Sequence, residues 1–91
     1  METKMDKEYM EQVVALNNLL FDEEQNLERL ERAVSAARYY MAAEPTNPER
    51  VFNLYGSTHN RNAQRKRVEE LRQQLQQKID EVYWHCNIES A

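Results

Sequence analysis

The stretch AAEPTNPERV, residues 42–51, holds both prolines of a 91-residue chain that has only one glycine. Pro45 disfavours helical geometry at the residue before it and therefore ends a helix nearby. Asn47 is suited to cap a new helix, Pro48 to its first position, and Glu49 to the positive end of its dipole. Because the stop and the restart lie a few residues apart, the stretch predicts the turn between two antiparallel helices.

The composition also favours helices. One Gly and two Pro are too few for an all-β fold with many turns, whereas Glu, Gln, Arg, Leu and Ala favour helix. A chain this short forms one domain, residues 1–91, and buries a modest fraction of its surface. The sequence predicts an all-α, coiled-coil-like helical hairpin, with a helix over 4–43, a turn over 44–47, a helix over 48–86 and a short tail over 87–91.

A heptad pattern runs along the first predicted helix. Apolar or aromatic side chains recur at spacings of four and three from Tyr9 to Met41, and only Glu23 interrupts the row. The row consists of Tyr9, Val13, Leu16, Leu20, Glu23, Leu27, Leu30, Val34, Ala37 and Met41. This spacing is typical of a helix that packs along one seam against another helix.

The second predicted helix begins with apolar residues over 51–55, turns polar, and regains an apolar row from Val68 to Cys86. Before it lies the polar stretch GSTHNRNAQRKR, residues 56–67. Gly56 and the polar residues after it are suited to end one helix and cap another. Alternatively, one helix continues and tolerates the glycine at a cost of about 1 kcal/mol. We favour a continuous or slightly broken helix.

The two halves of the chain match in an antiparallel register. With the turn centred near residue 45, Leu20 lies opposite a position next to Leu71. In the same register the acidic run 22–24 lies opposite the basic run 65–67. Apolar residues match apolar residues and acids match bases, so both patterns predict the same hairpin.

The middle of the first helix is the exception to this match. The positions opposite Leu27, Leu30 and Val34 carry small or polar residues. An apolar stripe without a partner is costly to leave exposed. We therefore expect these three residues at an interface with another molecule, either in a homo-oligomer, as a dimer or larger, or with a helical protein partner.

Two aromatic pairs lie near the ends of the predicted helices. Tyr39 and Tyr40 end the first helix, and Tyr83 and Trp84 lie near the end of the second. Tyrosine and tryptophan are common anchors of protein interfaces. They also pack ordinarily at helix ends, and the sequence leaves both interpretations open.

The second half carries a run of four cations, Arg61, Arg65, Lys66 and Arg67. Such a run can contact phosphates of a nucleic acid. It can equally form ion pairs with the acidic run 22–24 or with another subunit. The formal net charge of the chain is -4, which argues against a nucleic-acid partner. We favour ion pairing.

No catalytic or metal-binding pattern is visible. The only histidines are His59 and His85, and the only thiol is Cys86. These residues lack a recognised ligand spacing, and a hairpin lacks the pocket that a nucleophile pair needs. We expect neither an enzyme nor a cofactor.

The cysteine count and the apolar stretches of the sequence indicate a compartment. A single cysteine cannot form an intramolecular disulfide, which suits a reducing compartment. The first residues, METKMDKEYMEQ, lack the apolar core of a signal peptide, and no apolar stretch approaches the roughly 20 residues of a membrane span. The sequence predicts a soluble cytoplasmic protein.

The stretch EPTNPERV, followed by RVEELRQQLQQKIDEVYWHC at 67–86, resembles the small helical-hairpin co-chaperones of type III secretion systems. Members of that family hold a needle or filament subunit unpolymerised in the cytosol. The resemblance implies a protein-binding adaptor or chaperone that presents an apolar helix face to such a subunit. The alternatives are a small nucleic-acid-binding or regulatory protein that uses residues 61–67, and a structural oligomerisation module.

Overall fold

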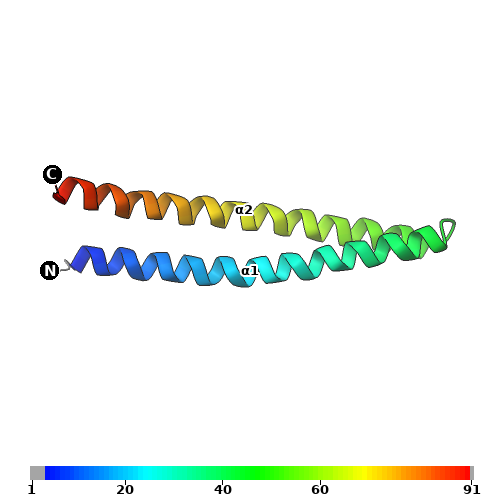
Figure 1. Ribbon diagram of the computed structural model, residues 1–91. Coiled ribbons are helices and arrows are strands. Elements are labelled where there is room, and N and C mark those ends of the chain that lie inside the picture. Colours follow the sequence, from blue (N-terminus) through cyan, green and yellow to red (C-terminus); the bar gives the residue numbers. More distant parts are fainter. Residues whose placement is uncertain (1–3, 91) are drawn as a thin grey trace.

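The computed structural model describes the backbone of residues 4–90 and the side chains of residues 7–84. Two helices, α1 (Lys4–Ala43) and α2 (Pro48–Ser90), account for nearly all of this part, which contains no strand. They run antiparallel and pack against each other, so both termini lie at the same end (Figure 1). The predicted all-α helical hairpin is confirmed.

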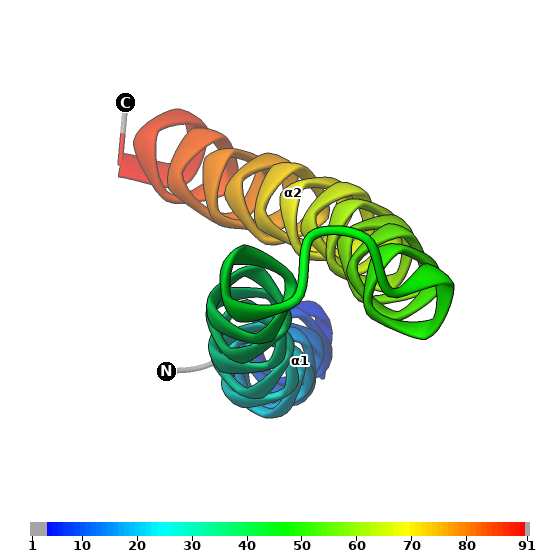
Figure 2. The same ribbon diagram turned by 90° about the vertical axis from the view of Figure 1, so that its right-hand side faces the viewer.

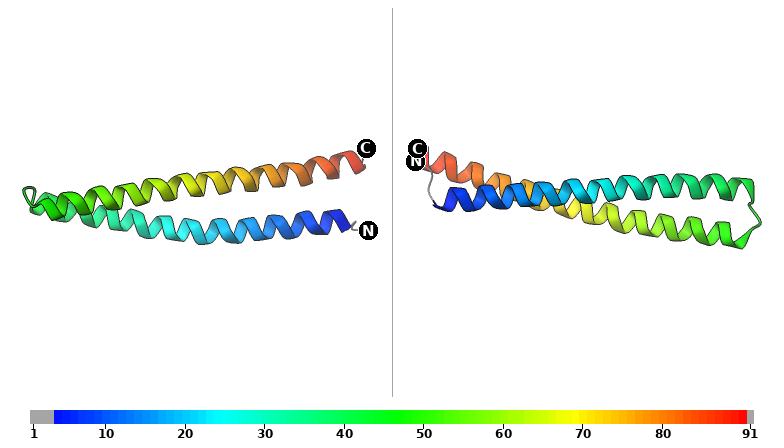
Figure 3. Two further views of the ribbon diagram at one scale, coloured as in Figure 1. Left: turned by 180° about the vertical axis from the view of Figure 1, so that it is seen from behind. Right: turned by 90° about the horizontal axis from the view of Figure 1, so that it is seen from below.

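Helix α2 is longer than expected. It continues to Ser90, past residue 86, so the segment expected to be a tail is helical as far as the structure describes it. The hairpin measures 67 × 17 × 13 Å. Views from the side, along the axis and from below show that the helices cross as they run from the turn to the open end (Figures 1, 2 and 3). A layer two helices wide has no interior away from its single seam.

The turn is held by Asn47. Its Oδ1 accepts a hydrogen bond from the Glu49 backbone N–H at 3.0 Å, which caps the first turn of α2. Its Nδ2 donates to Glu44 Oε2 at 2.7 Å, and Arg50 Nε lies 3.6 Å from the same oxygen. The bond from Asn47 and the charge of Arg50 lower the pKa of the Glu44 carboxyl below its usual value. The capping inferred from the sequence is therefore present.

The core of the hairpin is small. Leu20 packs in one buried cluster with Val68 and Leu71, and Leu27 and Leu75 pack against this cluster. The contact between Leu20 and Leu71 confirms the register expected from the sequence. Among the described residues only one other apolar side chain, Val34, is buried.

Gly56 lies inside α2, which continues through residues 56–60 without a break. A Cβ atom added at Gly56 would meet no other atom within 4 Å. Glycine is less favourable than alanine inside a helix by about 1 kcal/mol. We expect Gly56→Ala to raise the free energy of unfolding by about 1 kcal/mol, measured by urea denaturation at one protein concentration.

The reciprocal change at an exposed alanine of the same helix, Ala63→Gly, is the matched control. It should lower the free energy of unfolding by about the same 1 kcal/mol. A lower urea midpoint for Gly56→Ala would contradict the prediction, because it would mean that another molecule lies against this position.

Candidate protein-binding surface

A polar layer interrupts the seam between Leu20 and Leu27. The buried Gln64 donates from Nε2 to the Glu23 backbone oxygen at 2.9 Å and to Glu23 Oε2 at 2.6 Å. Arg67 Nε lies 3.1 Å from Glu23 Oε2. The bond from Gln64 lowers the pKa of the Glu23 carboxyl, and the charge of Arg67 adds to this effect. The acidic break in the heptad row is therefore matched by donors on α2.

This layer predicts a pH dependence of stability. Because the pKa of Glu23 is lowered in the folded state, its contribution is present above the usual carboxyl pKa of 4.5 and is lost as the pH falls through the folded value. We expect Glu23→Gln to lose less unfolding free energy than wild type between neutral pH and a pH below 4.5, measured by urea denaturation.

Glu70→Gln makes the same chemical change at an exposed carboxylate that forms no hydrogen bond or ion pair with the described residues. This control should follow the wild-type pH dependence. If Glu23→Gln follows it too, the layer contributes nothing to the acid sensitivity.

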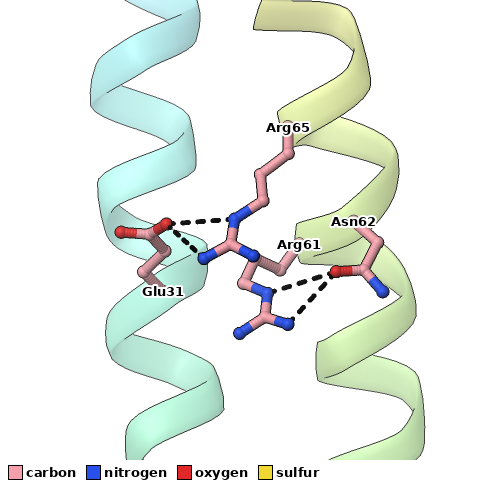
Figure 4. A network of polar contacts seen from close by, with 4 residues as sticks. All are labelled: Glu31, Arg61, Asn62 and Arg65. Atoms are coloured by element: carbon pink, nitrogen blue, oxygen red, sulfur yellow. Dashed lines mark hydrogen bonds and ion pairs between the residues drawn. The ribbon is translucent and has the colours of Figure 1, made fainter.

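The cations of the basic run are partly paired, but not as a block. Arg67 pairs with Glu23, whereas Arg65 reaches Glu31, with Nη2 3.1 Å from Oε1. Arg61 donates to the side-chain oxygen of its neighbour Asn62 (Figure 4). The expected match with run 22–24 therefore holds for one pair only. These side chains are about half exposed, and pairs of this kind contribute little to stability.

Glu24 and Lys66 of these runs do not pair with each other. Glu24, from the acidic run, pairs with Arg72 at 3.4 Å and not with residues 65–67. Lys66 is exposed and makes no ion pair within the described part of the chain. The structure thus pairs two of the four cations with carboxylates of α1.

The structure corrects the expectation for Val34, whereas the interface role of Leu27 and Leu30 stays a prediction. Val34 is 1% exposed, and the two leucines are half-buried, so the hairpin itself covers much of this stripe. At the corresponding level of α2, Ser57 is half-buried too. Small side chains let two helices approach closely, so they leave no open groove here. Val34 is not accessible to a second molecule.

The aromatic pairs singled out from the sequence are exposed. Tyr39 is 73% exposed, and Tyr40, Tyr83 and Trp84 are each at least half exposed. The Tyr39 and Tyr40 rings meet edge to face with centroids 5.7 Å apart, and the Arg50 guanidinium lies 4.9 Å from the Tyr40 centroid. These contacts leave most of the ring surface open to solvent.

Other exposed apolar side chains were not expected from the heptad row, because they lie outside it. Near the turn, Phe52 and Tyr55 are both 73% exposed, and Tyr55 stacks on His59 with centroids 6.4 Å apart. Near the open end, a hollow crosses the seam. It is lined by Met10, Val13, Ile79, Val82 and Tyr83. Val13 belongs to the heptad row, and Ile79 and Val82 belong to the apolar row of the second helix, whereas Met10 and Tyr83 lie next to these rows.

The large apolar side chains on the surface outnumber those in the core. Twelve of them in the described part are exposed, against four buried apolar residues. The twelve are Met10, Val14, Leu19, Phe21, Tyr39, Tyr40, Val51, Phe52, Tyr55, Ile79, Tyr83 and Trp84. This surface is suited to contact other apolar groups.

The described residues show no group of three or more His, Cys, Asp or Glu that would hold a metal ion. The side chains of His85 and Cys86 lie outside the described part. Over the residues searched, neither helix is long and apolar enough to cross a membrane. Comparisons with protein-family models, with curated proteins and with solved structures find no match to this chain.

Proposed function

We propose that this chain is a non-catalytic adaptor or chaperone that binds a helical protein partner through apolar and aromatic side chains of its hairpin. The excess of exposed over buried large apolar residues carries the proposal. Exposed apolar residues that gather into patches are typical of a protein interaction site.

The turn end supplies the strongest anchors. Four aromatic side chains lie on the helix ends that flank the turn, those of Tyr39, Tyr40, Phe52 and Tyr55. Each is at least half exposed. Tyrosine and other aromatic residues dominate binding energy when a partner buries them. The capped turn and the ring contacts hold several of these side chains in place before binding, which lowers the entropic cost of association.

The resemblance to the type III secretion co-chaperones suggests the class of partner. It would be a helical subunit of a needle or filament, kept unpolymerised in the cytoplasm while the hairpin covers its apolar face. An amphipathic partner helix would bind through spaced apolar anchors.

Binding of nucleic acid through the basic run is the alternative function. Of its members, Arg65 and Arg67 already pair with carboxylates, and the chain carries a formal net charge of -4. The net negative charge of the chain opposes binding of phosphates. This observation favours the protein partner.

Photo-crosslinking in the cells that naturally produce the protein tests the proposal. A photoreactive phenylalanine analogue replaces Tyr39 or Phe52, and the adducts are identified by mass spectrometry. We expect a discrete protein adduct at both positions, because both side chains point into solvent at the turn end.

Lys66, which is exposed on the same hairpin, is the matched control position. It should give no protein adduct. Nucleic-acid adducts at Lys66, without protein adducts at Tyr39 or Phe52, would contradict the proposal and support the alternative. No adduct at any of the three positions would also contradict it.

A further inference from the structure

The open end of the hairpin carries an apolar patch that the turn-end binding surface does not include. Met10 and Val14 on α1 are each 53% exposed, and Ile79 and Tyr83 on α2 are 41% and 69% exposed. Met10, Ile79 and Tyr83 line one hollow, and Met10 and Val14 line the hollow beside it. We call these four residues the open-end patch.

Charged residues lie on the same side of the hairpin as the open-end patch, nearer to the middle of the hairpin. Residues seven apart stay on one side of a coiled-coil helix. Glu24 and Glu31 follow Met10 by two and three such steps, and Arg72 and Arg65 precede Ile79 by one and two. The ion pairs Glu24–Arg72 and Glu31–Arg65 span the seam on this side, as the hollow does at the open end.

The two helices bring opposite charges to this side. Helix α1 offers three carboxylates there, those of Glu24, Glu28 and Glu31. Helix α2 offers Arg65 and Arg72, with Glu69 between them. The acidic strip of α1 therefore complements the net-positive strip of α2 at the same level of the hairpin.

We propose that a second copy of this chain binds to this side, with both open ends together and a two-fold axis parallel to the long axis of the hairpin. This symmetry places α1 of each copy on α2 of the other. The open-end patches then meet each other, and the acidic strip of each α1 meets the net-positive strip of the other α2. The product is a four-helix bundle, in which every helix has two antiparallel neighbours.

A reversed second copy fits less well. It would bring Met10 and Val14 level with the turn end of the other α1, where the same side carries Ser35 and Arg38. Ile79 and Tyr83 would face the turn end of the other α2, where the same side carries Val51 and Tyr55. However, α1 would lie on α1, so its acidic strip would miss the net-positive strip of α2. The charges thus favour one arrangement.

The size of this side is adequate for a stable dimer. Specific interfaces bury roughly 800 Å² of each partner. The hairpin is 67 Å long and 17 Å wide, so one side offers an area of this order. This inference goes beyond the proposed function, and its interface variant changes residues other than the crosslinking positions Tyr39 and Phe52, so the two proposals can fail separately.

Sedimentation equilibrium of the purified chain tests the interface. We expect a mass of twice 10.9 kDa for wild type. The variant Val14→Glu with Ile79→Glu places carboxylates in both patches and should sediment as a monomer at the same concentration. Phe52→Glu, at a more exposed apolar position outside this side, is the control and should remain dimeric. Circular dichroism checks that each variant stays helical.

A distance measurement tests the arrangement with the open-end patch unchanged. Thr46, exposed in the turn, becomes the only cysteine in Thr46→Cys with Cys86→Ser and carries a spin label. The proposed dimer predicts a distance comparable to the 17 Å width of the hairpin, and the reversed dimer one near its 67 Å length. A long distance, a monomeric wild type, or a dimer broken by Phe52→Glu but not by the double variant would each overturn the proposal.

Discussion

Leu20→Ala is expected to lower the free energy of unfolding by about 2–5 kcal/mol, because it removes a buried side chain and leaves a cavity. Leu20 packs against Val68 and Leu71 in the small buried cluster that joins α1 to α2. With so few buried residues, the loss is a large fraction of the stability of a short chain. Urea denaturation followed by circular dichroism at one protein concentration measures it.

Leu19→Ala is the matched control. It changes the same residue type one position away, where the side chain is 39% exposed. Alanine is at least as favourable as leucine in a helix, so we expect a much smaller loss. Equal losses at both positions would contradict the placement of the seam.

Gln64→Ala is expected to lower the free energy of unfolding by about 1–3 kcal/mol. It removes the two hydrogen bonds that Gln64 donates to Glu23 from a position that is 8% exposed. The Glu23 carboxylate then keeps Arg67 as its partner across the seam. The same urea experiment, at neutral pH, measures the loss.

Gln73→Ala is the corresponding control, because Gln73 is exposed on the same helix and its side chain makes no hydrogen bond within the described part. Exposed substitutions of this kind usually stay within about 0.5 kcal/mol of wild type. A loss at Gln64 no larger than at Gln73 would show that the polar layer adds no stability.

Local features of the sequence determined the main outline of the fold. Pro45, Asn47 and Pro48 restrict the backbone by their own chemistry, so the turn could be read from a few residues. The heptad row and the charge match predicted the seam and its register, because a one-dimensional pattern on a helix maps onto one side of it. The packing of Leu20 and the pair Glu23–Arg67 agree with that register.

Tertiary structure decided which side chains the seam covers. The sequence suggested an open stripe at Val34, yet close approach of the helices buries this side chain. It matched Arg65 with the acidic run 22–24, yet Arg65 reaches Glu31. Long side chains extend along the helix as well as across it, so the nearest partner depends on helix rotation and crossing.

The exposed surface also came from the tertiary structure. Met10 lies beside the heptad row of α1, and Phe52 and Tyr55 lie near the start of α2. Only the rotation of each helix about its axis shows that these side chains face solvent. The continuity of α2 through Gly56 was also decided by the tertiary structure. One glycine costs a helix about 1 kcal/mol, and packing on either side of it outweighs that cost. Local chemistry thus determined where the helices begin, end and pair, whereas packing between them decided which residues remain free to bind.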